Sequence, residues 1–221
     1  MTRPVLITGC SSGIGFATTR HLAERGVPVY ATVRTEDDAA RVGAIPNVEA
    51  LVCDVTDDRH VARLRRAIDE RGQGLWGIVH NAGIAQVGNL TATSVEDLMR
   101  VFDVNVFGVH RVTNAFVDLI RASRGRIVMM SSLSGTVASP ILGAYAMSKH
   151  AIEAYSDALA TQLGPEGIRV SAIVPGNYRS AIVESAVARF EVPEDASPEV
   201  ADLFEGTADR SRSSFPPPDD V

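Results

Sequence analysis

A tyrosine and a lysine stand four residues apart in the segment Tyr145-Ala146-Met147-Ser148-Lys149. On a helix this spacing places both side chains on one face. An ammonium group beside a phenol favours the phenolate, so it lowers a phenol pKa that ordinarily lies near about 10. Lys149 is the single lysine among 21 basic residues, which speaks against an incidental surface pair. The pattern predicts an acid/base pair that works nearer neutral pH.

A second group of residues gives the backbone a conformation that can bind a phosphate. The segment 8–15 reads Thr-Gly-Cys-Ser-Ser-Gly-Ile-Gly, follows an apolar run and opens a helical stretch. Glycines permit a tight turn and close approach to a ligand, and free amides at a helix N-terminus attract a pyrophosphate. A plain strand-to-helix turn is the alternative, although strand, glycines and helix occur in the order that a dinucleotide site requires. The expected contacts are Gly9, Ser11, Ser12, Gly13, Ile14 and Gly15.

Further polar residues follow the ends of apolar runs. Asn81-Ala82-Gly83 follows the fourth run and Ser131-Ser132 closes the fifth. Both groups therefore belong to the carboxyl edge of a sheet, where open α/β sheets bind ligands. From this position the Ser132 hydroxyl can form a hydrogen bond with a substrate oxygen. Asn105 interrupts an apolar helical stretch although asparagine is a poor helix former, so it is either solvent-facing or buried for its hydrogen bonds.

A parallel sheet would bring these residues together. Six continuous apolar runs are expected as strands: Pro4–Thr8, Val27–Val33, Val48–Cys53, Leu75–His80, Arg126–Ser131 and Arg169–Val174. Five stretches between them are expected as helices: Ile14–Arg25, Glu36–Gly43, Asp57–Arg71, Ser94–Ala122 and Tyr145–Leu163. Runs without polar alternation indicate burial on both faces. The alternation of strands and helices predicts a Rossmann-type doubly wound α/β sheet in one domain over 1–221.

Composition and charge exclude several function classes. With 45% hydrophobic residues among 221, the chain has enough apolar material for a core. Of the net charge of −6, residues 184–221 carry −7 and the rest +1, which predicts neither a nucleic-acid nor an anionic-membrane surface. No apolar run approaches a membrane span, and the start lacks a signal-peptide layout. Two cysteines and unclustered histidines predict no metal site, and we expect a cytoplasmic protein.

Together the motifs resemble the short-chain dehydrogenase/reductase family, in its short single-domain branch. The TGxxxGxG pattern at 8–15, Asn-Ala-Gly at 81–83, Tyr-x-x-x-Lys at 145–149 and Pro-Gly at 175–176 occur in the family's order, over residues 4 to about 180. The resemblance implies a catalytic tetrad of Asn105, Ser132, Tyr145 and Lys149. Tyr145 would exchange a proton with the substrate oxygen while hydride passes at the nicotinamide. Ser132 would orient that oxygen, Lys149 would lower the tyrosine pKa and hold the ribose, and Asn105 would keep a water in the proton relay.

The same resemblance implies further coenzyme contacts. They are Asp54 and Val55 after the third strand, Asn81, Ala82 and Gly83 after the fourth, and Pro175, Gly176, Ser180, Tyr145 and Lys149. Val33 stands where NAD enzymes generally carry an acid, and Arg34 follows with a guanidinium that suits a 2′-phosphate. Three acids at 36–38 oppose that reading. We expect NADP in preference to NAD.

The resemblance implies an oxidoreductase that interconverts a secondary alcohol and a ketone with NADP(H). The segment 31–34 is similar to members acting on lipophilic carbonyls and alcohols such as steroids and retinoids. Two alternatives remain: a catalytically silent dinucleotide-binding protein, and an isomerase or dehydratase that uses the same tyrosine with NAD. Substrate choice is expected to lie in the loops 84–93, 133–143 and 177–213, the last a mobile substrate loop.

Two expectations concern the size and assembly of the protein. Family members continue into a further helix and a seventh strand, so the chain is expected to be short of those elements. The helices over 94–122 and 145–163 carry apolar residues beyond one sheet-facing stripe, such as Phe107, Val117, Ile152 and Tyr155. Exposed apolar surface of that extent predicts an interface. We expect a homodimer or homotetramer built on these helices.

Overall fold

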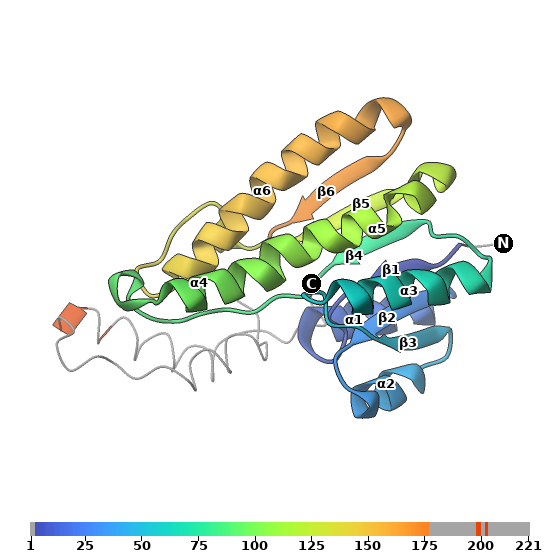
Figure 1. Ribbon diagram of the computed structural model, residues 1–221, viewed down its shortest axis with the longest axis horizontal. Coiled ribbons are helices and arrows are strands. Elements are labelled where there is room, and N and C mark those ends of the chain that lie inside the picture. The colour runs from blue at the N-terminus through green and yellow to red at the C-terminus, as the bar shows by residue number, and fades with distance from the viewer. Residues whose placement is uncertain (1–2, 177–197, 200–201, 203–221) are drawn as a thin grey trace.

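A single parallel sheet organises the part of the chain that the structure describes. The computed structural model describes residues 3–176, 198–199 and 202. Six strands stand in the order β3-β2-β1-β4-β5-β6 (Figure 1). Their bounds are β1 Val5–Ile7, β2 Val29–Val33, β3 Val48–Val52, β4 Gly77–His80, β5 Arg126–Met130 and β6 Arg169–Ile173. The strand order reverses between β1 and β4, and ligands bind at such a switch point.

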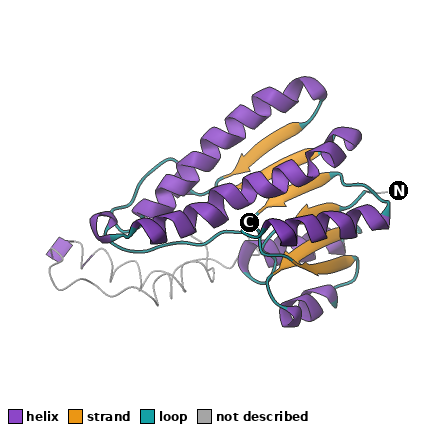
Figure 2. Ribbon diagram, in the orientation of Figure 1, coloured by secondary structure: helices purple, strands orange, loops and turns teal. Residues whose placement is uncertain are grey.

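Helices cover both faces of the sheet. They are α1 Gly13–Glu24, α2 Glu36–Gly43, α3 Asp58–Arg71, α4 Val95–Phe102, α5 Gly108–Ser123 and α6 Gly143–Leu163. Short helical turns lie at η1 Leu90–Ala92, η2 Asp103–Phe107, η3 Leu133–Gly135 and η4 Gly164–Glu166. Figures 1 and 2 show α3 and α5 crossing one face of the sheet. The doubly wound α/β sheet expected from the sequence is therefore confirmed.

The core consists of two apolar layers separated by the sheet. Successive residues of β1 point to opposite sides, so Leu6 joins one layer and Ile7 the other. The larger layer packs α3, α5 and α6 against the sheet, with Phe116 fully buried. The smaller layer packs α1 and α2 against β1, β2 and β3. Burial on both faces explains why the strand sequences are continuous apolar runs.

The edge strand β6 differs from the strands at the switch point. Its residues alternate between exposed and half-buried, whereas β1, β2 and β4 are buried throughout. Ile173 and Val174 are each about two-fifths exposed. This part of the sheet thus presents apolar side chains at its surface.

The single helix expected over 94–122 is interrupted in the structure. Between α4 and α5 the chain forms the π-helical turn η2, whose backbone hydrogen bonds span one residue more than in an α-helix. Apolar periodicity continues on both sides of the turn, so the sequence pattern conceals it. The turn places Asn105 inside the protein, where it is 1% exposed.

Two of the residues expected at an apolar interface differ in their exposure. Ile152 is 2% exposed and belongs to the larger core layer, so it is no part of the apolar surface that was expected to form an interface. Phe107 is half exposed, as that expectation requires.

The expected substrate loop 177–213 lies almost wholly outside the described residues. None of the described helices is both long and apolar enough to span a bilayer.

Candidate active site

The glycine loop between β1 and α1 is shaped by close contact with the end of β4. Gly9 has a φ of +72°, and a Cβ there would lie 2.7 Å from the Cα of Ala82. Gly13 also has a positive φ, of 59°. A Cβ at Gly15 would meet the Asn81 amide and the Gly9 carbonyl oxygen. The glycines are therefore required by backbone conformation and packing, and they leave the loop's own backbone open to a ligand.

Asn81 and Thr8 lock this loop to β4. The Thr8 hydroxyl accepts hydrogen bonds from the backbone N–H groups of Asn81 and Ala82, each at 3.0 Å. The Asn81 amide nitrogen donates to the carbonyl oxygens of Thr8 and Gly9, at 3.0 and 2.9 Å. The Asn-Ala-Gly segment thus holds the glycine loop in place. Thr8 was missed as a functional residue, although it opens the TGxxxGxG motif.

The N-terminus of α1 is suited to an anion. Its N-cap residue, Ser12, makes no side-chain capping bond, and the first turn contains no acid. By contrast α2, α3 and α4 are capped by Thr35, Asp57 and Ser94, and each has an acid in its first turn. Unsatisfied N–H groups and the helix dipole favour a phosphate. The loop and helix therefore fit a dinucleotide pyrophosphate.

Arginine side chains lie beside the end of β2. Val33 is buried and Arg34 is exposed. Among the described residues Arg34 makes no hydrogen bond or ion pair, though its charge contributes to lowering the pKa of Asp38. Arg41 on α2 donates to the Ser11 carbonyl oxygen and to Asp38, both at 2.6 Å. One guanidinium is thus tied to the glycine loop while the other is available to an anion.

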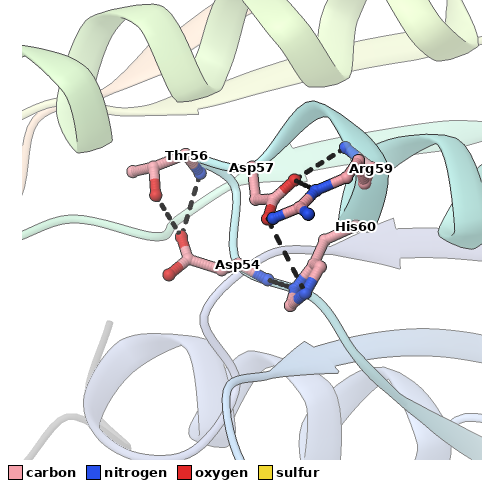
Figure 3. Close-up of polar contacts among 5 residues, drawn as sticks. All are labelled: Asp54, Thr56, Asp57, Arg59 and His60. Carbon is pink, nitrogen blue, oxygen red and sulfur yellow. Dashed lines mark hydrogen bonds and ion pairs between the residues drawn. The ribbon is translucent and has the colours of Figure 1, made fainter.

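A compact set of polar contacts follows β3 (Figure 3). Asp54 Oδ1 accepts hydrogen bonds from the backbone N–H and the hydroxyl of Thr56, at 2.9 and 2.8 Å. The Asp54 N–H donates to His60 Nδ1 at 3.2 Å. Val55, next in the chain, packs so closely on Gly108 that a Cβ there would lie 2.7 Å from Val55 Cγ2. The expected coenzyme contacts Asp54 and Val55 therefore sit in a turn held firmly between β3 and α3.

Tyr145 and Lys149 share one face of α6, as their spacing predicted. The Lys149 ammonium lies over the Tyr145 ring, 5.5 Å from its centroid, and donates to the Met130 carbonyl oxygen at 2.6 Å. Lys149 is only 5% exposed. Burial lowers the pKa of Lys149 to about 8, against the opposing effect of the Glu153 charge. The lysine is therefore poised to gain or lose a proton near neutral pH.

The pKa of Tyr145 departs from the sequence expectation. It is raised above its ordinary value because the hydroxyl is buried, and a side-chain hydrogen bond with Ser132 acts in the opposite direction. The expected lowering by Lys149 is not found in this arrangement, in which the ammonium donates to the Met130 carbonyl oxygen on β5. Ser132 also accepts from the Ser134 N–H at 3.1 Å, so its hydroxyl is fixed beside the tyrosine.

Asn105 has a buried, bond-making role. Its side-chain oxygen accepts from the Ile84 N–H, and its amide nitrogen donates to the Ile84 carbonyl oxygen and to the Ser148 hydroxyl, all at 2.9 Å. Ser148 in turn donates to the Tyr145 carbonyl oxygen at 2.7 Å. The π-helical turn thus joins the strand β4 side of the site to α6. Ser148 was missed, although it lies within the Tyr-x-x-x-Lys segment.

Two of the loops expected to choose a substrate meet at this edge. The Gly88 N–H donates to the Ile141 carbonyl oxygen at 2.9 Å, and Gly88 bridges to Leu142. A Cβ at Gly143 would lie 3.1 Å from Leu90 Cβ. Both loops and the neighbouring helix starts expose apolar side chains: Leu90, Val95, Met99, Leu133, Val137 and Met147. Leu133 directly follows Ser132 in the chain, so exposed apolar groups occur next to the tetrad.

The remaining expected contacts are divided by the limits of the described chain. Pro175 is buried, and its carbonyl oxygen accepts from the Leu133 N–H at 3.2 Å, which ties the end of β6 to η3. Gly176 is exposed at the end of the described segment, and Ser180 lies outside the described residues. Among the described residues no group of three His, Cys, Asp or Glu side chains could hold a metal ion.

The chain is similar to known proteins over most of its length. A family model described as short chain dehydrogenase matches residues 3–189. The mitochondrial D-beta-hydroxybutyrate dehydrogenase of Bos taurus is 36% identical over 190 residues, which are 81% of this chain and 55% of that protein. Retinol dehydrogenase 16 of Homo sapiens is 37% identical over 209 residues, 90% of this chain and 65% of that protein. The chain thus spans between half and two thirds of the length of these relatives.

Solved structures of other proteins have a similar fold. A variant of the actinorhodin polyketide ketoreductase with NADPH has a TM-score of 0.83 and 27% sequence identity. The match covers 99% of this chain and 87% of that one.

Proposed function

We propose, because this chain belongs to the short-chain dehydrogenase/reductase family, that it is an NADP(H)-dependent oxidoreductase that interconverts a secondary alcohol and a ketone. The observation that carries the proposal is the juxtaposition of Ser132, Tyr145 and Lys149 at the carboxyl edge of the sheet. The Ser132 hydroxyl acts to lower the pKa of Tyr145, and the Lys149 ammonium lies over the tyrosine ring. That set provides a proton donor, a group to orient an oxygen, and a cation.

The residues present fit a dinucleotide. The glycine loop offers a backbone cradle that a Cβ at Gly9 or Gly15 would disrupt, and α1 offers an uncapped N-terminus. Gly13 and the Ser11 and Ser12 backbone would hold the pyrophosphate, Asp54 and Val55 the adenine side, and Lys149 the nicotinamide ribose. When bound, the coenzyme supplies or accepts the hydride.

The protein's own part of the reaction is to handle a proton. Ser132 fixes the substrate oxygen beside the Tyr145 hydroxyl, and Tyr145 donates a proton to the oxygen in ketone reduction or takes one from it in alcohol oxidation. The Lys149 ammonium lies over the Tyr145 ring, so it provides a positive charge beside the phenolate that remains after donation. Asn105 acts through Ser148 and Ile84, which it holds in place; it is a positioning residue in this arrangement.

Arg34 supports NADP as the preferred coenzyme. Its guanidinium is exposed at the end of β2, and Val33 offers no carboxylate to a ribose 2′-hydroxyl. A guanidinium suits a 2′-phosphate because it is always charged and donates in a fork. The ketoreductase of similar structure was solved with NADPH. The acids at 36–38 act against this preference, and Asp38 is already engaged by Arg41.

The surface beside the tetrad supports a lipophilic substrate. Leu90, Leu133 and Val137 are 43%, 51% and 69% exposed in the two loops that meet there. Exposed apolar side chains gathered at a site favour an apolar ligand. Among the relatives, one is named for retinol and one for the short polar acid hydroxybutyrate, so the chemistry of the loops is the better guide.

Turnover of a panel of ketones and secondary alcohols with each coenzyme tests the function. The expected result is reduction of bulky apolar ketones, faster with NADPH than with NADH at subsaturating coenzyme. Binding of NADPH without turnover of any substrate would favour the silent binding protein. Product with a shifted double bond or lost water, and no net coenzyme oxidation, would favour the isomerase or dehydratase.

Assembly into a homodimer or homotetramer is the last part of the proposal. Phe107 is half exposed on the turn between α4 and α5, and Val117 and Tyr155 are half-buried on α5 and α6. Pairing of these helices with a second copy would remove that apolar surface from water. Light scattering at micromolar concentration should give at least twice the chain mass of 23.5 kDa. A mass of one chain would contradict the proposal.

A further inference from the structure

Two buried side-chain oxygens behind the tetrad have no hydrogen-bond partner among the described residues. They are Ser131 Oγ and Glu153 Oε1. Buried polar atoms are nearly always paired, so each exception calls for a physical reason. The mechanism above uses neither residue.

Both oxygens face one small region beside η3. A Cβ at Gly135 would lie 2.8 Å from Ser131 Oγ and 3.2 Å from Glu153 Oε1. A Cβ at this position would require the Ser131 and Glu153 side chains to shift. The region lies between the end of β5, which bears Ser131, and the face of α6 that bears Glu153.

That face of α6 also bears the catalytic pair. Glu153 follows Lys149 by four residues, as Lys149 follows Tyr145, so the three side chains form one stripe along the helix. The Lys149 ammonium donates to the carbonyl oxygen of Met130, the residue directly before Ser131. The carboxylate and the ammonium are therefore held on the same side of α6, next to the same strand end.

The surroundings of Lys149 make Glu153 electrostatically important. Burial disfavours the ammonium, and the charge of Glu153 acts in the other direction. The remaining groups that face the lysine are the Tyr145 ring on α6 and the Met130 carbonyl on β5. From the π-helical turn comes the neutral amide of Asn105, bonded to Ser148. Of the described groups around the lysine, Glu153 is the one that carries an opposite charge.

We propose that Glu153 is a positioning residue for the active site: its carboxylate, with Oε1 buried beside η3, keeps the Lys149 ammonium one helical turn away charged. The inference rests on the proposed function for its importance in catalysis. A carboxylate oxygen without a local hydrogen-bond donor keeps its negative charge unshared, so that charge acts fully on the lysine, which gives the unpartnered Oε1 a physical reason.

The single lysine of the chain makes a direct test simple. Protein grown with lysine labelled at the ε-carbon gives one NMR signal, whose titration reports the Lys149 pKa without assignment. The midpoint should lie near 8 in the unchanged protein. In Glu153→Gln, which keeps the shape and removes the charge, it should fall by about one pH unit.

A matched control separates this local effect from a general change of charge. Asp157 lies one turn farther along α6 and is exposed, so Asp157→Asn removes the same charge and should move the midpoint by less than a third as much. Glu153→Asp keeps the charge and should restore most of the midpoint. An equal or smaller fall in Glu153→Gln than in Asp157→Asn would overturn the proposal.

A second variant covers a failure of Glu153→Gln to fold. Glu153→Ala removes the same charge and buries no amide, and the same fall is expected. The measurement needs neither coenzyme nor substrate. If the Lys149 midpoint falls in Glu153→Gln but the unchanged protein turns over no substrate, this inference stands and the proposed function fails. If the unchanged protein turns over substrate but the midpoint is the same in Glu153→Gln, the proposed function stands and this inference fails.

Discussion

The two halves of the sheet edge offer a ligand different things. Beside β1, β2 and β3 the surface that faces a ligand is mostly backbone: a glycine loop and an uncapped helix N-terminus, with Arg34 at the rim. Beside β4, β5 and β6 it is side chains, several of them buried, that gather around Lys149. A backbone site depends on shape and tolerates no added atom. A side-chain site depends on charge and protons, so an isosteric change can remove its chemistry while the shape survives.

The sharpest test of that contrast is Tyr145→Phe. The ring keeps its packing and the proton donor is removed, so turnover should fall by about 10³-fold while the coenzyme dissociation constant changes by less than about twofold. Stopped-flow or steady-state rates together with fluorescence titration of NADPH measure both quantities. Tyr155→Phe, ten residues along α6, removes a hydroxyl outside the tetrad and should keep its turnover. Rates for Tyr145→Phe within a few-fold of the unchanged protein would contradict the assignment.

On the backbone side, Gly9→Ala should cost stability as well as coenzyme affinity. Its Cβ would lie 2.7 Å from the Ala82 Cα, at a positive φ, so we expect a loss of about 3 kcal/mol in the free energy of unfolding. Gly26→Ala is the matched control, because Gly26 has a similar φ of +75° but no atom within 4 Å of its Cβ position. It should lose about 1 kcal/mol. Equal losses in urea denaturation would show that the contact with β4 does not matter.

The buried histidine at the end of β4 predicts sensitivity to acid. His80 is 3% exposed, lies 3.0 Å from the Thr113 hydroxyl through Nε2, and burial lowers its pKa to about 3. The unfolded chain binds a proton below about pH 6.5 and the folded chain does not, so stability is lost as the pH falls from 6.5 towards 3. Between pH 6.5 and 5 the loss should be about 2 kcal/mol.

A comparison of two histidine variants isolates that contribution. Urea denaturation at both pH values should show a smaller decrease for His80→Asn than for the unchanged protein. His21→Asn, at an exposed position of α1, should keep the full decrease. The same acid dependence in all three proteins would rule out His80 as its source.

The smallest expected effect belongs to the rim of the backbone site. Arg34→Ala should raise the Michaelis constant for NADPH by about tenfold, since an exposed guanidinium contributes modestly, and that for NADH by less than twofold. Arg25→Ala removes the same charge at the end of α1 that lies away from the glycine loop, and it should change neither Michaelis constant. Equal losses for both coenzymes in Arg34→Ala would show that this residue does not recognise the 2′-phosphate.

The two halves also differ in how far the sequence predicted them. The strands and most helices were predicted to within two residues, because burial on both faces gives each strand a continuous apolar run. The glycine loop was predicted equally well, since positive φ values and close packing admit little but glycine. The side-chain half was predicted less well. Its π-helical turn is hidden by uninterrupted apolar periodicity, and Ile152 looked like surface although it is core.

By itself, the amino-acid sequence determined the order of elements, the parallel sheet and the order of motifs that resembles one enzyme family. These follow from local patterns of apolar residues and glycine along the chain. Only the tertiary structure decided the charge states at the site. A raised Tyr145 pKa, a Lys149 pKa near 8 and an unpartnered Glu153 oxygen arise from burial and from contacts between β5, η3 and α6. Desolvation depends on everything packed around a group, and no spacing along the chain encodes that.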